Sequence, residues 1–492
     1  VSQLSAAKGG KYELVIYQKT GIGNGNQSSN PWLQEMPDPV SKITWDNYIT
    51  MNPADVAEKK LFGVEDGSGM MVRFDQMEDE LDVVSIKANG YEVKLPVWPQ
   101  PGQTRGTVGI AVGYGRKGYN EVIDSLGQNI YPAVGLNANG TMSYEVFDVA
   151  ISDATGERHP IAATQTHHTL MGRNKDIIRE TTLAEYKKDE RAGNPLNTLH
   201  TYKGEQMVEN VTLWNDFERP NHQWALAIDL NACIGCGACV VACNAENNVS
   251  VVGKEEVRKS REMHWMRIDR YFSSDTVKEK VEETGEMGTM AMYRSMENPS
   301  FDNPKVVFQP LMCQHCNHAP CETVCPVLAT NHSSEGLNQM TYNRCVGTRY
   351  CANNCPYKVR RFNWFNYVEY HRFKNINPAQ DDLGRMVLNP DVTVRSRGVM
   401  EKCSMCVQRI QAGKLEAKKA GVRPKDGSIN TACAQSCPTN AITFGDLNDQ
   451  QSKVAEMEQD SRKYEVLEVI GVKPSVFYMT KVWNREDENA HL

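Results

Sequence analysis

Short apolar runs, several of them alternating with polar residues, characterise the first 150 positions of the chain. Bounded by Gly, Asn or Asp, such runs are typical of strands joined by turns; they occupy 12–17, 70–74 and 91–97. A helix is predicted after Asn52, because its side chain can cap a helix and Pro53 suits the first turn. This helix should end near Gly63. Short strands with one helix favour a small β-barrel over a doubly wound sheet.

Residues 151–220 differ, since they carry little hydrophobic periodicity and many polar side chains. The composition predicts an extended connector that drapes over a neighbouring domain. The connector includes an adjacent pair, His167 and His168. Neighbouring side chains face different ways, so we interpret this pair as surface residues and not as metal ligands.

Residues 221–492 form a third region, with strands predicted over 224–228 and 265–272. A polar, acidic insertion covers 273–304 and contains Met287, Met290, Met292 and Met296. Thioethers can ligate copper(I), but this composition favours an adaptable packing surface. The tail from Asp446 begins as a charged helix and ends in a predicted edge strand, 473–479, because it contains Pro474.

Composition limits the functional classes. The 492 residues are enough for about three domains, and the net charge of -7 includes no basic block that would bind nucleic acid. No run approaches the ~18 consecutive apolar residues of a membrane-spanning helix. The sequence starts at Val1, which predicts a mature or truncated product whose upstream part, including any targeting peptide, is not in view.

The cysteines carry the candidate chemistry. All 15 lie between Cys233 and Cys437, and an odd number in four tight groups argues against a disulfide framework. The groups are Cys233-x2-Cys236-x2-Cys239-x3-Cys243, Cys313-x2-Cys316-x4-Cys321-x3-Cys325-Pro326, Cys345-x5-Cys351-x3-Cys355-Pro356 and Cys403-x2-Cys406-x26-Cys433-x3-Cys437-Pro438.

The spacing favours iron–sulfur clusters. A C-x2-C-x2-C-x3-C run is the bacterial ferredoxin pattern, in which three cysteines hold one cubane and the fourth reaches another cluster. Structural zinc is the alternative, but zinc sites use two C-x2-C pairs separated by a spacer. No C-x-x-C-H motif occurs, so the chain is expected to attach no c-type haem.

The third group departs from the pattern, because Thr348 stands where a regular run from Cys345 would place a cysteine. A hydroxyl is a poor substitute for a thiolate ligand. We therefore predict a three-iron cluster here, and the total of 15 cysteines then leaves none over. A four-iron cluster completed by Thr348, water or another oxygen ligand is the alternative.

These four groups resemble the four-cluster ferredoxin subunits of dimethyl sulfoxide, polysulfide and nitrate reductases. The resemblance implies an α+β fold, with a duplicated ferredoxin-type domain whose loops bind three 4Fe-4S clusters and one 3Fe-4S cluster. It implies these ligand sets: Cys233, Cys236, Cys239 and Cys437 for one cubane; Cys243, Cys403, Cys406 and Cys433 for a second; Cys313, Cys316, Cys321 and Cys355 for a third; and Cys325, Cys345 and Cys351 for the three-iron cluster.

The first domain resembles the C-terminal, double-psi-like cap barrel of molybdopterin oxidoreductases, on residues 30–35, 37–39, 52–53 and 113–116. Fusion of this barrel to a four-cluster domain, together with residues 344–357, resembles the B subunits of alternative complex III. That family implies the C-terminal portion of a longer protein, at the periplasmic face of the membrane, without bound molybdopterin. It also implies a quinol-binding membrane subunit, multihaem and monohaem cytochrome c subunits, and in some cases a terminal oxidase as partners.

The predicted function is one-electron transfer from quinol toward cytochrome c, with the three-iron cluster as first acceptor. A molybdenum-dependent reductase is the rival, and a zinc-stapled scaffold is a weaker one. Residues 357–365 are rich in Arg and aromatic side chains, which fits either a docking surface or core packing beside the clusters. For His315 and His318, hydrogen bonding within the loop is favoured over tuning of a cluster or carrying a proton.

Overall fold

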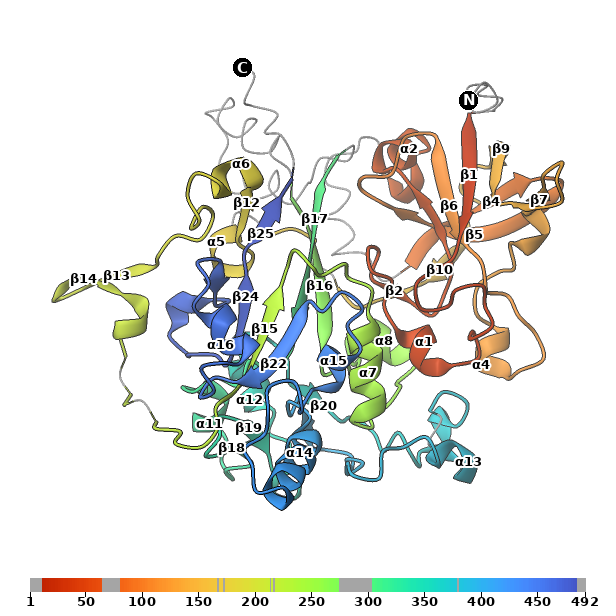
Figure 1. The fold of residues 1–492 in the computed structure, drawn as a ribbon. Coiled ribbons are helices and arrows are strands. Elements are labelled where there is room, and N and C mark those ends of the chain that lie inside the picture. Colours follow the sequence, from red (N-terminus) through yellow and green to blue (C-terminus); the bar gives the residue numbers. More distant parts are fainter. Residues whose placement is uncertain are drawn as a thin grey trace.

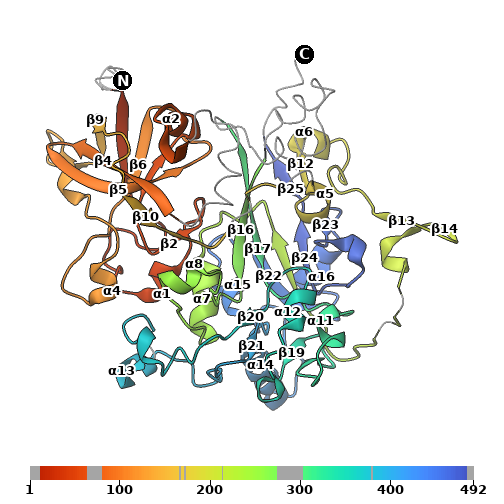
Figure 2. The ribbon, with the colours of Figure 1, turned by 180° about the vertical axis from the view of Figure 1, so that it is seen from behind.

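The structure is a computed structural model that describes residues 11–484 apart from 64–79, 166–167, 171–172, 213, 216, 274–302 and 378–379. The predicted strand 70–74, the four methionines of the insertion and His167 lie outside the described residues. A barrel domain stands beside the rest of the chain (Figures 1 and 2).

Six strands close the barrel. Strand β4 (Glu80–Ala88) pairs with β5 (Tyr91–Pro99) and also with β9 (Glu145–Ile151), which completes the circuit β4-β5-β3-β6-β1-β9. The parallel pairs are β1 with β6 and β3 with β5. The other barrel strands are β1 (Tyr12–Tyr17), β3 (Ile49–Met51) and β6 (Thr107–Ala111). The predicted α+β fold with a small barrel is confirmed.

The predicted helix of the barrel domain is α2 (Pro53–Glu58). Its cap is as expected, since the Asn52 side chain accepts a hydrogen bond of 2.8 Å from the Ala54 N–H. Further elements of this region are α1 (Pro31–Glu35), β2 (Ile43–Thr44), η1 (Leu61–Gly63), α4 (Glu121–Asp124), η2 (Tyr131–Ala133), β7 (Gly135–Leu136) and β8 (Met142–Ser143). The barrel encloses an apolar core that runs from Tyr12 to Val149.

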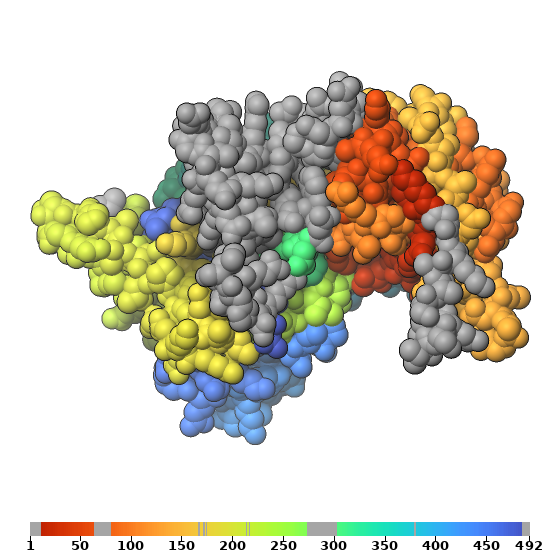
Figure 3. Space-filling model, turned by 90° about the horizontal axis from the view of Figure 1, so that it is seen from above, coloured from red at the N-terminus to blue at the C-terminus, as the bar shows by residue number. Residues whose placement is uncertain are grey.

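The segment that follows the barrel forms strand pairs with the barrel region on one side and with the C-terminal region on the other. Strands β10 (Arg158–Pro160) and β11 (Ala162–Ala163) add to β4 and β2, and β12 (Glu180–Thr182) pairs with β25 (Lys481–Trp483) near the C-terminus. The hairpin of β13 (Thr198–Thr201) and β14 (Gly204–Met207) projects from the body (Figure 1). Seen from above, the yellow part of this segment lies opposite the barrel (Figure 3). Its short helices are α5 (Asn174–Ile177), α6 (Leu183–Tyr186) and η3 (Val208–Asn210).

His168 corrects the surface interpretation. Its side chain is buried, and its Nδ1 lies 2.9 Å from the Nη2 of Arg270. The cause is backbone pairing with the next domain, since the Phe272 N–H donates to the His168 carbonyl at 2.8 Å.

A four-stranded sheet in the order β22-β15-β24-β23 supports the cysteine-rich region. Its strands are β15 (Trp224–Asp229), β22 (Ile442–Asp446), β23 (Lys463–Tyr464) and β24 (Val476–Met479). The edge prediction for 473–479 is wrong, because β24 lies between β15 and β23. Pro474 precedes the strand, so it removes no ladder hydrogen bond.

Helices and hairpins carry the ligand loops. The helices are α7 (Ala238–Glu246), α8 (Lys254–Arg258), α11 (Pro320–Thr323), α12 (Tyr350–Asn354), α13 (Asp382–Arg385), α14 (Val407–Lys419), α15 (Ala432–Gln435) and α16 (Lys453–Glu458), with η4 (Tyr342–Arg344), η5 (His371–Phe373) and η7 (Glu468–Ile470). The strand pairs are β16 (Arg267–Ser273) with β17 (Lys305–Leu311), β18 (Thr330–His332) with β19 (Asn338–Met340), and β20 (Arg361–Phe362) with β21 (Met400–Glu401). In the described part of the chain, none of the helices has the length and apolar character of a membrane span.

Candidate iron–sulfur sites

The first ligand loop is a tight turn that leads into α7. Gly235 and Gly237 both have positive φ, 72° and 79°. A Cβ atom on Gly235 would lie 2.5 Å from the Phe308 ring, so a larger residue would push the loop off β17. Glycine therefore lets the loop fold back, and it brings Cys233 and Cys236 toward Cys239 on α7.

Two predicted cubane sets each line a cavity of their own. One cavity is lined by Cys233, Cys236, Cys239 and Cys437. The other is lined by Cys313, Cys316, Cys321 and Cys355. Each combines cysteines that are far apart in the sequence, so the fold brings both sets together.

The remaining two sets also converge. Burial raises the pKa of Cys243, and the thiols of Cys403, Cys406 and Cys433 raise it further. Burial likewise raises the pKa of Cys351, and Cys345 and Cys325 add to this effect. The geometry agrees for the first of these sets, since the Asn247 Nδ2 lies 3.6 Å from the Cys243 sulfur and 4.0 Å from the Cys406 sulfur.

Two cysteines that precede prolines share a local geometry. The Cys325 sulfur accepts a 3.2 Å hydrogen bond from the Ala329 N–H, and the Cys437 sulfur accepts one of 3.2 Å from Ala441. Although burial acts in the opposite direction, backbone N–H groups lower the pKa of both thiols. The repeated geometry is that of a duplicated ferredoxin unit, with one such cysteine in each half.

Two pairs of packed helices show the same twofold repeat. Helix α7, which carries Cys239 and Cys243, packs on α15, which carries Cys433. Helix α11, with Cys321, packs on α12, with Cys351. Each pair therefore places thiols from two distant segments around a common space.

The buried thiols favour a positively charged occupant. Burial raises the pKa of Cys239 and Cys316 well above the usual range and that of Cys321 to about 12. A thiolate at such a position needs a cation beside it, which bound iron supplies. In the described residues, no three His, Cys, Asp or Glu side chains converge as a single-ion site does.

Hydrogen-bond donors surround the sulfurs. The Asn247 Nδ2 donates to the Cys243 sulfur at 3.6 Å, and the Ala432 N–H donates to the Cys406 sulfur at 3.4 Å. The Met405 N–H donates to the Cys403 sulfur at 3.3 Å. Hydrogen bonds to the sulfurs stabilise negative charge, and they are one means by which a protein sets a cluster potential.

Arg360 lies between the second and third cysteine groups. It is buried, and its Nη2 donates to the Thr330 hydroxyl at 2.7 Å. Burial lowers the pKa of Arg360, but the thiols of Cys321 and Cys351 outweigh it and raise the value. Its Nε and Nη1 have no hydrogen-bond partner among the described residues, which fits an anionic group beside them.

Residues 357–365 act mainly as core. Tyr357, Val359 and Asn363 are buried with Arg360, while Arg361 and the three remaining aromatic side chains are half-buried. Of the two interpretations of this stretch, the structure supports packing and charge compensation beside the cysteines. His315 is fully buried, and its Nδ1 accepts a 3.0 Å bond from the Asn338 N–H, in agreement with the loop-bonding prediction.

Lys402 is a site residue that the sequence reasoning missed. Its buried Nζ donates to the carbonyl of Asn338 and, at 2.9 Å, to that of Cys403. Burial raises the pKa of Cys321, and Lys402 is one of the cations that oppose this rise. Its position next to Cys403 in the sequence was the available signal, whereas Arg360 is placed by the tertiary fold.

Thiols of different predicted sets influence one another. Burial is the main cause that raises the pKa of Cys239, and Cys433 of the second set raises it further. Burial likewise raises the pKa of Cys403, and Cys313 of the third set adds to this effect. Arg360 interacts with both Cys355 and Cys351.

Comparison with known proteins supports the same chemistry. Two family profiles, both described as a 4Fe-4S dicluster domain, match residues 232–329 and 304–371. The iron–sulfur cluster-binding subunit of menaquinone reductase from Nitratidesulfovibrio vulgaris is 33% identical over 54% of this chain and 92% of its own length. The chain belongs to this family of iron–sulfur electron-transfer subunits.

Other relatives belong to related complexes. A putative dimethyl sulfoxide reductase iron–sulfur subunit from Halobacterium salinarum is 32% identical over 52% of this chain and 78% of its own length. An Hdr-like menaquinol oxidoreductase iron–sulfur subunit from Archaeoglobus fulgidus is 30% identical over 53% and 84%. The chain is thus a ferredoxin-type subunit of the quinol-linked respiratory oxidoreductase and molybdoenzyme family, with 4Fe-4S clusters bound by its cysteine motifs.

Proposed function

We propose that the fifteen cysteines hold three 4Fe-4S clusters and one 3Fe-4S cluster in the ligand sets given above. The single observation that carries this proposal is the convergence of thiols from distant segments into two separate four-cysteine sets. The clusters supply one-electron transfer when bound. The chain's own residues hold them, keep water away and donate hydrogen bonds to the sulfurs.

The three-iron assignment follows from one position. Thr348 is exposed and lies in the loop between Cys345 and Cys351. It offers a hydroxyl where a fourth thiolate would be needed, so the corner iron of a cubane would lack its ligand. The set of Cys325, Cys345 and Cys351 then suits a cluster with one iron fewer.

In this proposal, electrons enter at the three-iron end from an integral-membrane quinol-oxidising subunit. Leu328, Val346 and Tyr350 lie within three residues of its ligand cysteines along the chain and are 57%, 65% and 55% exposed. Apolar and aromatic side chains of this kind are typical of interface anchors. Electrons then pass through the three cubanes toward cytochrome c subunits.

The whole assembly proposed is a quinol:electron acceptor oxidoreductase of the alternative complex III type, peripheral to the membrane at its periplasmic face. The barrel of residues 1–150, the connector of 151–220 and the iron–sulfur domain of 221–492 are its proposed units. The fusion of a barrel to a cysteine-rich domain in one chain supports this type.

A molybdenum-dependent reductase is the second candidate, and the dimethyl sulfoxide reductase relative favours it. Metal analysis of the intact complex distinguishes the two. We expect iron without stoichiometric molybdenum, together with reduction of the three-iron cluster when quinol is added. One molybdenum per complex would instead support the reductase.

A further inference from the structure

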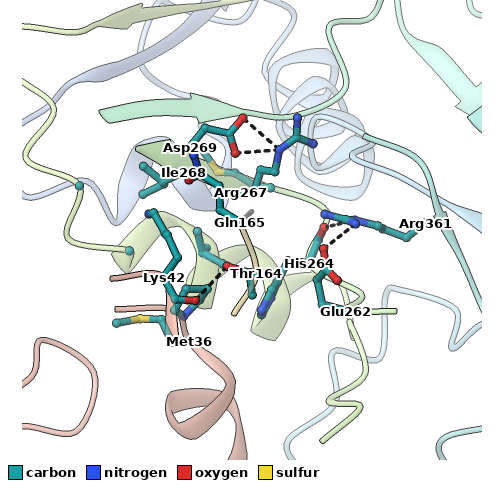
Figure 4. A pocket seen from close by; sticks show the side chains of 15 residues that line it. Met36, Lys42, Thr164, Gln165, Glu262, His264, Arg267, Ile268, Asp269 and Arg361 are labelled. Atoms are coloured by element: carbon teal, nitrogen blue, oxygen red, sulfur yellow. Dashed lines mark hydrogen bonds and ion pairs between the residues drawn. The ribbon is translucent and has the colours of Figure 1, made fainter. Parts of the chain in front are cut away.

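A small pocket lies where the barrel domain meets the first ligand loop (Figure 4). The barrel side contributes Met36 and Lys42, and the ligand loop contributes Gly235 and Gly237. The cavity is therefore bounded on one side by the turn that carries the first cluster's cysteines.

Most charges around this cavity are paired. Arg267 binds Asp269 at 2.9 Å, and Arg361 binds Glu262 at 2.8 Å. Lys42 differs, because it is only 3% exposed and its ammonium has no hydrogen bond or ion pair with any residue that the structure describes. A buried cation without a partner is costly unless an anionic group lies near it.

The backbone holds Lys42 in place. Its carbonyl accepts a 3.0 Å bond from the Thr164 N–H, and the nearby Val40 carbonyl accepts one of 2.7 Å from Arg270 Nε. At the other end of the barrel-domain segment 35–42, the Glu35 carboxylate accepts hydrogen bonds from the backbone N–H groups of Val252, at 3.0 Å, and Gly253, at 2.7 Å. The loop is thus fixed to the iron–sulfur domain at both ends.

The same loop touches the ligand turn directly. A Cβ atom on Gly237 would lie 3.0 Å from the Met36 sulfur, so the two segments are in close contact. Burial lowers the pKa of Lys42 to about 7 and Arg270 lowers it further, whereas Asp269, Asp38 and Cys233 raise it. The Cys233 sulfur therefore lies within electrostatic reach of the ammonium.

We propose that Lys42 is a counter-charge that the barrel domain places beside the cluster of Cys233, Cys236, Cys239 and Cys437, and that it raises this cluster's reduction potential. Reduction adds one negative charge to the cluster, and a nearby buried cation stabilises that charge. The inference rests on the proposed function, because it requires a cluster at this site. It gives the barrel a role in electron transfer without a cofactor of its own.

The test is Lys42→Met in the full chain, followed by redox titration with electron paramagnetic resonance. We expect reduction of this one cluster to become at least threefold less favourable, which lowers its midpoint by about 28 mV at 59 mV per tenfold change. The other clusters should keep their potentials. Lys94→Met is the control, because Lys94 also belongs to the barrel domain but is 53% exposed and pairs with Glu157 at 2.8 Å. Its shift should be close to zero.

Two results would overturn the inference. One is a Lys42→Met protein with full iron content whose midpoint moves no more than that of Lys94→Met. The other is an equal shift in Lys42→Arg, since that variant keeps the charge and would reveal a packing effect. Absence of clusters from the wild-type protein would count against the proposed function itself and is recognised by its iron content.

Discussion

The two ends of the cysteine chain differ in how they are covered. At the Cys233 end, the barrel domain packs against the ligand turn and buries Lys42 there. At the Cys345 end, apolar side chains such as Val346 and Tyr350 remain exposed. The barrel domain covers one side of the first ligand turn, although Ile234 next to Cys233 is 57% exposed, whereas the second end carries several exposed apolar side chains, as a surface that meets a partner does.

This difference has a functional consequence. A cluster covered by its own chain has its electrostatic environment fixed before any complex assembles. A cluster near an exposed apolar surface acquires part of its environment from the partner, so its rate of reduction depends on docking.

The largest effect is expected from removal of a ligand. Cys316→Ser takes one sulfur from a buried set and should remove or convert that cubane, with loss of up to four irons. Iron analysis and electron paramagnetic resonance measure this loss. Ser404, which lies between two ligand cysteines but has no proposed ligand role, provides a control as Ser404→Ala. An unchanged iron content in Cys316→Ser would contradict the ligand set.

Thr348→Cys should convert the three-iron site toward a cubane, because it supplies the missing thiolate. The oxidised protein would lose its three-iron signal and quinol-linked turnover would slow. Thr348→Ser is the control, since it retains a hydroxyl and should leave both unchanged. Unaltered spectra and rates in Thr348→Cys would count against the assignment.

Val346→Asp places a charge in the exposed apolar surface and should slow quinol-linked reduction about tenfold, since a buried, unpaired charge weakens docking. Rapid-mixing measurement of cluster reduction in the intact complex gives the rate. Leu415→Asp, at a residue of α14 that is also half-exposed, should have little effect. Equal slowing by both variants would show that the effect is not specific to the three-iron end.

The smallest effect is expected at His264, which lies at the Cys233 end beside the barrel domain. Burial lowers the pKa of His264 to about 4, from an ordinary value of 6.5. Below pH 6.5, the His264 side chain therefore binds a proton in the unfolded chain but not in the folded chain. The free energy of unfolding consequently falls as the pH drops. The loss between pH 7 and 5.5 should be about 1 kcal/mol. Denaturant unfolding of wild type and His264→Gln tests this, and an identical pH dependence in both would contradict it.

The sequence predicted well whatever depends on local pattern. The cap at Asn52, strands β1, β5 and β15 and the grouping of the cysteines all follow from neighbouring residues. It failed where distant segments meet: His168 is buried by pairing with β16, and β24 is covered by β23. Lys42 belongs to this second class, because its role follows from which thiols the fold brings beside it.

The central claim is the distribution of fifteen cysteines over three cubanes and one three-iron cluster. Chemical assay of iron and acid-labile sulfide in the purified protein, combined with electron paramagnetic resonance of the oxidised state, tests it most directly. We expect about fifteen irons per chain and a three-iron signal before reduction. About sixteen irons without that signal, or zinc in place of iron, would contradict it.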